Sequence, residues 1–249
     1  MTTSTKPIVS VFYMSNFNIA CADEPIEPTQ QRGAAIANCL PRLRDTDSRP
    51  DLRAMTYDIE QINSIIKARR STFPKQYDPA VTIPEDVVRQ IVENATYAPS
   101  HGNLQPWKFV VFSGEGRRKL AEFQAELYKT ESGENFKQAT YDGLLANPLK
   151  AAYVIALCLK RDPNKKFPEI EEISAVACGV QNMYLTATAY GLGAYWTTGG
   201  VTYKASAKEF FGLGEDDKLM GFFYIGAVAV PSPAKERAAL QDKVEWVVS

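Results

Sequence analysis

The sequence has few of the residues that most metal and acid–base sites require. It contains one histidine, His101, among 249 residues, so a site with two imidazole ligands is excluded. Any Ser/His/Asp or Cys/His catalytic arrangement would have to use that single residue. The four cysteines show no C-x-x-C spacing, which favours a reducing compartment, and Cys158 and Cys178 lie in apolar stretches where a free thiol behaves as a small hydrophobe. We therefore expect no metal site and disfavour most hydrolase mechanisms.

Charge and hydropathy exclude further classes of protein. The 28 Lys and Arg residues are balanced by 29 Asp and Glu residues, so nothing favours a nucleic-acid or membrane-surface partner. The longest apolar run, around residues 151–159, is far shorter than the roughly 18–20 residues that cross a bilayer. Neither G-x-G-x-x-G nor G-x-x-x-x-G-K-[ST] occurs, which leaves a nucleotide-binding fold of the chain's own without support. With 45% hydrophobic residues, the chain has enough apolar material for one sizeable core, and we expect it in the cytoplasm.

The first 55 residues differ from the rest. They show no sustained helical or strand periodicity, and we predict an irregular extension at residues 1–55 followed by one domain at residues 56–249. A secretory signal, an organelle transit segment, and an appended or mis-started extension upstream of Met55 are the alternatives. The periodic pattern that begins at Asp58 favours the last of these, and organelle targeting stays open.

From Asp58 onward the pattern alternates between helix and strand. The apolar spacing predicts helices because isoleucines, valines and alanines recur at intervals of three and four, and it predicts strands where β-branched and aromatic residues cluster. The Thr82-x-x-Glu85 spacing indicates a capping box at the start of the second helix. The alanine and glycine content of the long helix suggests close packing against another helix. Expected helices cover residues 59–70, 85–98, 115–130, 170–190 and 205–211, and expected strands cover residues 107–112, 151–159, 194–197 and 219–230.

Three clusters carry residues suited to ligand binding. Arg69-Arg70-Ser71 closes the first helix and could hold a phosphate, although basic residues there also simply favour the helix dipole. The turn-rich segment 98–107 offers amides and hydroxyls for the edge of a polar heterocycle, with a plain connecting loop as the alternative. The segment 193–200 ends a strand in glycines, where a backbone can approach a flat ligand, unless it is an ordinary turn.

In this order, the clusters resemble the nitroreductase family of flavin enzymes. The resemblance covers residues 57–248 and rests on Arg69-Arg70-Ser71 and on the Ala-Pro-Ser-x-x-Asn-x-Gln-Pro-Trp string at 98–107. It is extended by Ala-x-Gly-Leu-Gly at 189–193 ahead of Trp196, by Phe-x-Gly-Leu at 210–213, and by the glycines at 221 and 226. The middle string is the most specific of these features.

The resemblance implies an α+β fold, an α/β sandwich whose central, mostly antiparallel sheet is flanked by helices. It also implies a homodimer with one FMN at each of two sites shared by both chains. The phosphate and pyrimidine side of the flavin would then lie at Arg69, Arg70 and Ser71, and basic residues near the C-terminus would reach the phosphate. The other implied contacts are Pro99, Ser100, His101, Asn103 and Gln105 from the partner chain, Trp196, Thr197, Thr198 and Gly199 beside the flavin ring, and Lys235 and Arg237 at the phosphate.

The function implied by the resemblance is ping-pong oxidoreduction. NADH or NADPH would give hydride to flavin N5, and a small acceptor such as a nitroaromatic or quinone would then take it. No side-chain acid or base is needed, so we name no catalytic residue. Alternatives are a flavin-binding storage or partner-binding protein, and other flavin reactions on the same fold. The stretch 131–150 is compact, so we expect little lid, an open site and broad acceptor specificity.

Overall fold

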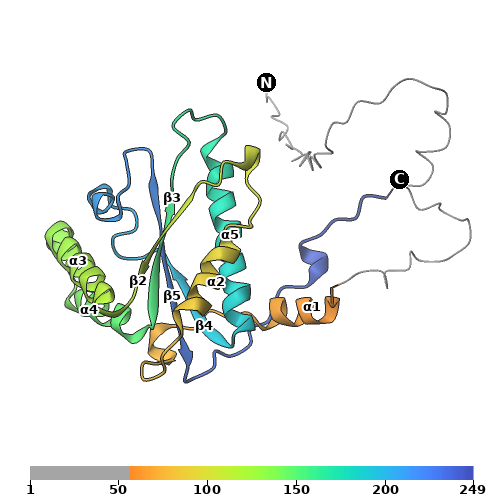
Figure 1. Cartoon of the computed structure of the whole chain (residues 1–249), viewed down its shortest axis with the longest axis horizontal. Coiled ribbons are helices and arrows are strands. Elements are labelled where there is room, and N and C mark those ends of the chain that lie inside the picture. The colour runs from red at the N-terminus through yellow and green to blue at the C-terminus, as the bar shows by residue number, and fades with distance from the viewer. Residues whose placement is uncertain (1–56, 249) are drawn as a thin grey trace, which may run out of the picture. The chain divides into compact units, whose positions relative to one another are not determined.

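The computed structural model describes residues 57–248. The predictions for residues 1–55 therefore concern residues that lie outside the described range. Figure 1 shows a central sheet with helices on both of its faces. The predicted α+β architecture is confirmed.

The sheet has five strands, and every neighbouring pair of them is antiparallel. Strand β5 pairs with β3 over residues 218–225, with β1 beyond that point, and with β4 over residues 222–227. Strand β2 pairs with β3 and forms an edge. The strands are β1 (Tyr77–Asp78), β2 (Trp107–Phe112), β3 (Tyr153–Leu159), β4 (Leu192–Thr197) and β5 (Lys218–Val228). Sequence periodicity could not find β1, because two residues show no alternation.

The described residues form five α-helices, and four of them cover the sheet. In Figure 1, α2 and α5 lie against one face and α3 and α4 against the other. The helices are α1 (Ile59–Ala68), α2 (Glu85–Ala95), α3 (Gly114–Ser132), α4 (Gln138–Lys150) and α5 (Glu169–Ala189). The predicted short helix at 205–211 is two 3₁₀ turns, Ala205–Ala207 and Glu209–Phe211. Other 3₁₀ turns span Pro74–Gln76, His101–Asn103, Gly133–Asn135 and Leu240–Asp242.

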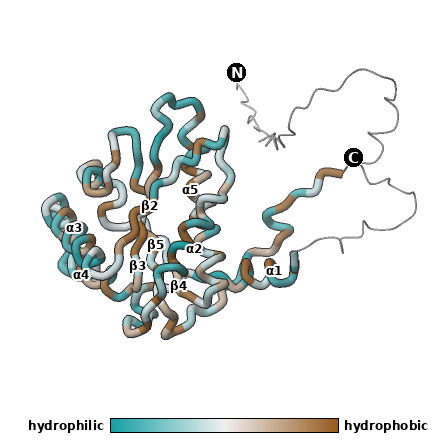
Figure 2. The backbone as a smooth tube through the Cα atoms, viewed as in Figure 1, coloured by the Kyte–Doolittle hydropathy of each residue, from teal (hydrophilic) through white to brown (hydrophobic). Residues whose placement is uncertain are grey.

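The core divides at the sheet because successive strand side chains point to opposite faces. On β5, Phe222 and Tyr224 pack on the α3 side, whereas Phe223 and Ile225 pack on the α2 and α5 side. Figure 2 shows apolar stretches along the central strands and hydrophilic stretches along α3, α4 and the outer loops. The sheet therefore holds two apolar layers together.

Close packing of α2 against α5 is confirmed. A Cβ placed on Gly179 of α5 would lie 2.9 Å from the carbonyl oxygen of Ala95 in α2. Only a residue without a side chain lets the two helices approach this closely.

Two expectations from the sequence were wrong, and one helix was not predicted. The second helix begins with Pro84 as its N-cap and has no side-chain cap, so Thr82 and Glu85 form no capping box. In the stretch 131–150, for which we predicted no helix or strand, residues 138–150 form helix α4. Cys178 is exposed on α5. Cys158 is buried as expected, and burial raises the pKa of its thiol to about 12, so this cysteine is chemically inert at neutral pH.

Candidate functional site

Two of the three predicted clusters meet at the free edge of β4. The segment that follows α1 runs beside this strand, with a parallel bridge between Ser71 and Ala194 and a 2.8 Å hydrogen bond from the Thr72 amide to the Ala194 carbonyl. The hydroxyl of Tyr77 donates to the Thr72 carbonyl at 2.7 Å. Burial raises the pKa of Tyr77 far above its ordinary value, so its hydroxyl keeps the proton it donates. The Arg-Arg-Ser segment is thus fixed within a few residues of Thr197.

The two arginines of this segment have different surroundings. The guanidinium of Arg70 donates to the carbonyls of Lys67 and Arg69, which lie at the C-terminus of α1. The guanidinium of Arg69 lies over the ring of Tyr184, 5.1 Å from its centroid. Among the described residues, Arg69 has no hydrogen-bond acceptor for its guanidinium. Arg69 is therefore the arginine available to an anion, while Arg70 closes the helix.

The segment after β4 forms a tight turn. Thr197 accepts a hydrogen bond from the Gly199 amide at 3.3 Å, and the hydroxyl of Thr202 donates to the Gly199 carbonyl. The indole of Trp196 donates to the Met220 carbonyl at 2.9 Å, so this donor is already used inside the fold. The free polar groups of this segment belong to the threonines and the glycine backbone.

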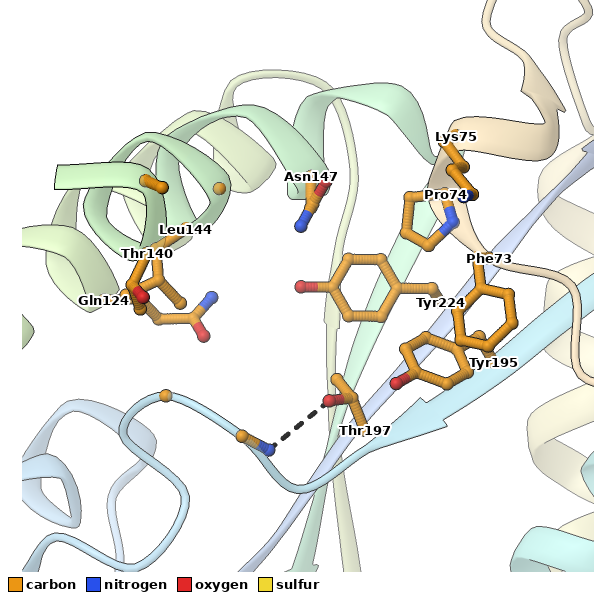
Figure 3. A pocket seen from close by; sticks show the side chains of 14 residues that line it. Phe73, Pro74, Lys75, Gln124, Thr140, Leu144, Asn147, Tyr195, Thr197 and Tyr224 are labelled. Atoms are coloured by element: carbon orange, nitrogen blue, oxygen red, sulfur yellow. Dashed lines mark hydrogen bonds between the residues drawn. The ribbon is translucent and has the colours of Figure 1, made fainter. Parts of the chain in front are cut away.

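A cavity of about 500 Å³ opens beside this turn (Figure 3). Phe73, Tyr195 and Tyr224 form an aromatic wall, with the rings of Phe73 and Tyr195 4.6 Å apart. The facing wall comes from α3 and α4 and carries polar side chains. These are Gln124, Thr140 and Asn147, with Thr197 at the β4 end and Lys75 at the opposite rim. The size is typical of small-molecule sites.

Gln124 is the most informative residue of the cavity. Its side chain is 2% exposed, and its amide nitrogen Nε2 has no hydrogen-bond partner among the described residues. An unpaired buried donor costs about 1–3 kcal/mol, which a ligand with an acceptor in the cavity would recover. The carbonyl oxygens and ring nitrogens of a flavin pyrimidine are such acceptors. The residues present therefore fit the flat, polar-edged ring of FMN.

Gly200 lets the turn after β4 lie close to helix α4 at the cavity wall. Its φ is +67°, and a Cβ at this position would lie 2.9 Å from Cδ2 of Leu144 on α4. Both the backbone conformation and the space require glycine here. Helix α4, which was not predicted from the sequence, thus closes the cavity against the turn after β4.

The third predicted cluster lies elsewhere in the same chain. His101 contacts Glu171 in the first turn of α5, whereas Arg69 lies over Tyr184 near its other end. Residues 171 and 184 are 13 positions apart on this helix, which at 1.5 Å per residue is roughly 20 Å. Figure 1 shows the His101 loop beside one end of α5 and α1 beside the other. One chain does not bring all three clusters to one place.

The predicted basic pair lies in the extended C-terminal segment. Lys235 and Arg237 are exposed, and neither makes an ion pair within the described residues. The start of this segment is anchored at the site, because the hydroxyl of Ser232 donates to the Ser71 carbonyl at 2.9 Å. Their predicted role at a phosphate stays a prediction, as do the roles of the other predicted site residues.

Most residues that line the cavity were not predicted from the sequence. Phe73, Lys75, Gln124, Asn147 and Tyr224 line it, yet none was a candidate. Gln124 looks like a surface residue of a charged helix in the sequence, and its burial depends on α4. A signal was present only for Phe73 and Lys75, which directly follow the Arg-Arg-Ser segment.

The model of the Nitroreductase family matches residues 66–227, more than half of the chain. The chain belongs to the nitroreductase family. YdjA of Escherichia coli strain K12 is 31% identical over 154 residues, which cover 59% of this nitroreductase and 82% of YdjA.

Solved nitroreductase structures share the fold. A nitroreductase-like family protein from Bacillus cereus is 26% identical, with a TM-score of 0.64 over 78% of this chain and 99% of its own. The FMN-dependent nitroreductase NfnB from Mycobacterium smegmatis, solved in complex with NADPH, is 21% identical, with a TM-score of 0.58 over 77% of this chain and 100% of its own. The described part of this nitroreductase contains no helix long and apolar enough to cross a membrane. Residues 57–248 also hold no group of three side chains suited to a metal ion.

Proposed function

We propose that this nitroreductase is an FMN-dependent oxidoreductase that passes hydride from NADH or NADPH to a small nitroaromatic, quinone or similar acceptor in a ping-pong reaction. The observation that carries the proposal is the cavity beside the Arg-Arg-Ser segment, with its unpaired Gln124 donor. The M. smegmatis relative of the same fold is FMN-dependent and was solved with NADPH, and a relative from Desulfovibrio desulfuricans was solved with FMN. Bound FMN would supply hydride acceptance and donation, and the protein would supply binding, orientation and electrostatics.

The residues near the β4 edge would each bind a different part of the FMN. The guanidinium of Arg69 and the hydroxyl of Ser71 would hold the phosphate or the pyrimidine edge by charge-assisted hydrogen bonds. Gln124 would donate to a ring acceptor from inside the cavity. A fixed positive charge beside the ring would favour the anionic reduced state, because it is already oriented before the charge develops.

We infer that the working form is a homodimer whose flavin sites use both chains. The His101 loop lies about 20 Å along α5 from Arg69 in one chain, so a site that joins the predicted clusters needs a second copy. Helix α1 buries none of its residues, although Ile59, Ile62 and Ile66 lie along it and are exposed. Trp246 and its neighbours in the C-terminal segment are exposed as well. A second copy of the chain would cover these apolar side chains.

Two further proposals concern the whole chain. Residues 1–55 would be an extension outside the catalytic domain, in agreement with a family match that begins at residue 66. We propose the cytoplasm as the place of action, because the thiol of Cys158 and the exposed Cys178 are free.

The first test is spectroscopic. We expect the purified protein to show a flavin spectrum that bleaches on anaerobic addition of NADH or NADPH and returns with a quinone or nitroaromatic. A flavin that neither donor reduces would favour the storage function, and a protein that cannot be reconstituted with FMN would overturn the cofactor proposal.

Substitution of Gln124 tests the cavity directly. Gln124→Leu removes the unpaired donor at nearly constant volume, so the apoprotein should become more stable while FMN binds about tenfold more weakly. Both are measured on the same samples, by urea unfolding of apoprotein and by fluorescence titration with FMN. Glu122→Leu, at an exposed position of the same helix, is the control and should leave FMN affinity unchanged. An unchanged FMN affinity in Gln124→Leu would place the flavin outside this cavity.

A further inference from the structure

The single histidine is held by residues far from it in the sequence. Nδ1 of His101 and Oε2 of Glu171 lie 2.6 Å apart. The imidazole also stacks on the ring of Phe167, with centroids 3.6 Å apart and planes inclined by 20°. One face and one nitrogen of the ring are therefore fixed by α5 and the loop before it.

The loop that carries His101 has an unusual backbone conformation and internal hydrogen bonds. Gly102, Asn103 and Gln105 all have positive φ, at 59°, 54° and 50°. Side chains of the loop bond one another, since the Gln105 amide donates to Oγ of Ser100 and the Gln105 side chain donates to Oδ1 of Asn103. Backbone strain of this kind persists where the surroundings fix it and is typical of binding sites. His101 is the residue by which α5 fixes the loop.

Glycine at position 102 is required by the same contact. A Cβ there would lie 2.7 Å from Cε2 of Phe167, which is closer than real Cβ atoms approach another heavy atom. The loop backbone thus approaches the Phe167 ring while His101 stacks on it. The arrangement leaves little freedom for the imidazole.

The supports of His101 are themselves anchored. The guanidinium of Arg161 pairs with the buried carboxylate of Glu172 and donates to the Phe167 carbonyl at 3.0 Å. Glu171 lies between Ile170 and this buried pair on the first turn of α5, and its amide donates to the Pro168 carbonyl at 3.0 Å. The other charged group near the ring pair is Lys166, whose Nζ lies 5.2 Å from the Phe167 centroid. Phe167 and Glu171 are therefore fixed before any ligand binds.

A carboxylate beside Nδ1 decides which nitrogen carries the proton. Ionised Glu171 only accepts hydrogen bonds, so the neutral imidazole places its proton on Nδ1. Nε2 is then left as a hydrogen-bond acceptor, and within residues 57–248 it has no partner. Over half of the His101 side chain is exposed, so Nε2 is open to a molecule outside this chain.

We propose that Glu171 is a positioning residue for the flavin reaction, holding His101 as the Nδ1–H tautomer so that Nε2 accepts a hydrogen bond from an N–H or O–H group at the site shared with the partner chain. The proposal rests on the proposed function, because the His101 loop meets a flavin site only in the dimer. Glu171 itself touches neither the cofactor nor the acceptor and acts through His101.

The tautomer can be measured without interference, because the chain has one histidine. The experiment uses the FMN-loaded protein with ¹⁵N-labelled histidine and without a histidine tag, at mildly alkaline pH, where an ordinary histidine is neutral. Long-range ¹⁵N–¹H spectra should show the proton on Nδ1 in the wild type. Glu171→Ala should shift the population to the Nε2–H tautomer. Glu169→Ala is the control and should keep the wild-type pattern. Glu169 lies on the same helical turn as Glu171, but its carboxylate pairs with Lys218.

Kinetics then test whether the tautomer matters to the reaction. Glu171→Ala should lower kcat/KM for the acceptor by about tenfold at unchanged FMN content, as expected for loss of one oriented hydrogen bond. In a His101→Ala background, the same substitution should have no further effect, because Glu171 acts only through the imidazole. Glu171→Asp should recover part of both the tautomer and the rate.

The outcomes separate this inference from the proposed function. A wild-type proton on Nε2, or a tautomer unchanged by Glu171→Ala, overturns the positioning of His101. A changed tautomer with unchanged kcat/KM overturns its role in the reaction, and so does a full additional loss in the His101→Ala background. A wild type that binds no flavin overturns the proposed function, and the NMR spectrum of that protein still decides the tautomer.

Discussion

Tyr77 determines where the Arg-Arg-Ser segment lies, and two glycines make room for the Tyr77 ring. A Cβ on Gly226 would come within 2.4 Å of Cγ of the Tyr77 ring, and one on Gly193 would come within 2.8 Å of its Cε1. The hydroxyl of Tyr77 then reaches the Thr72 carbonyl. A strand glycine can mark such a close approach of another group, and here the group is the tyrosine that positions the Arg-Arg-Ser segment.

Gly226→Ala should therefore weaken both stability and cofactor binding. The added methyl displaces the Tyr77 ring, so we expect a loss of about 1–3 kcal/mol in the free energy of unfolding. Urea unfolding monitored by circular dichroism measures it, and FMN titration reports the displaced segment. Gly116→Ala is the matched control, because the nearest atom to its Cβ is 3.8 Å away and it lies in α3. That variant should gain up to about 1 kcal/mol from helix propensity.

The two arginines of the segment should respond differently to substitution. Arg69→Ala removes a guanidinium that is free to meet an anion, and we expect FMN affinity to fall at least tenfold and the flavin midpoint potential to become more negative. Arg70→Ala removes a cap from the C-terminus of α1 and should affect helix stability more than flavin binding. Isothermal titration and anaerobic redox titration measure these effects. Full FMN retention and an unchanged potential in Arg69→Ala would contradict the assignment.

At the scale of elements, the helices and strands with a clear apolar period could be predicted from the sequence. The strands at Trp107–Phe112 and Tyr153–Leu159 and the helix Glu169–Ala189 have long apolar patterns, and each was found within a few residues. Helix α4 was missed because Gly143 and Pro148 interrupt it, and it lacks a strong apolar face.

The site was predictable only where it is local in sequence. The Arg-Arg-Ser segment and the turn after β4 were both named, but their contact depends on the pairing of Ser71 with Ala194, a long-range feature that no spacing reveals. Gln124 could not be found, because its burial needs α4 and the turn at Gly200 together. Glu171 was missed for the same reason, since 70 residues separate it from His101.

One ion pair between elements gives the fold a dependence on pH. The carboxylate of Asp217, before β5, faces the ammonium of Lys160, after β3, and accepts from the amides of Gly214 and Arg161 at 2.7 and 2.9 Å. Burial alone would raise the pKa of Asp217, but these hydrogen bonds outweigh it and hold the pKa below its ordinary value. The carboxylate therefore stabilises the fold above the pKa of the unfolded chain, and this contribution is lost as pH falls through the lower, folded value.

Asp217→Asn should lower the free energy of unfolding by about 1–2 kcal/mol at pH 7, the size expected for charge-assisted hydrogen bonds with one partly exposed partner. The difference from wild type should begin to shrink below about pH 4, where Asp217 of the unfolded chain becomes protonated, and should be lost as pH falls through the lower pKa of the folded protein. Urea unfolding from pH 7 to pH 3 measures it. A difference that does not change with pH would show that the charge of Asp217 contributes nothing. Asp216→Asn, at an exposed neighbouring pair with Lys165, should change stability by a few tenths of a kcal/mol.

At the scale of the whole molecule, the apolar surface and the divided site have one common explanation. Helix α1 and the C-terminal segment expose Ile59, Ile62, Ile66, Trp246 and Val247, and the predicted flavin contacts lie at opposite ends of α5. A symmetric dimer would cover the apolar surface and bring the two parts of the site together. Ile62→Asp should therefore reduce the dimer fraction, measured by light scattering after gel filtration. Ile62→Leu keeps the apolar surface and is the control.

A site built from both chains couples cofactor binding to assembly. If FMN contacts both chains, it binds the dimer more tightly than the monomer, and thermodynamic linkage requires FMN to tighten the dimer by the same factor. Sedimentation equilibrium should then give a smaller dimer dissociation constant with FMN than without it. Ile62→Asp should lose FMN on dilution at concentrations where wild type retains it, because its dimer dissociates first. Equal dimer dissociation constants with and without FMN would show that the flavin is held by one chain alone, and His101 would then have no access to it.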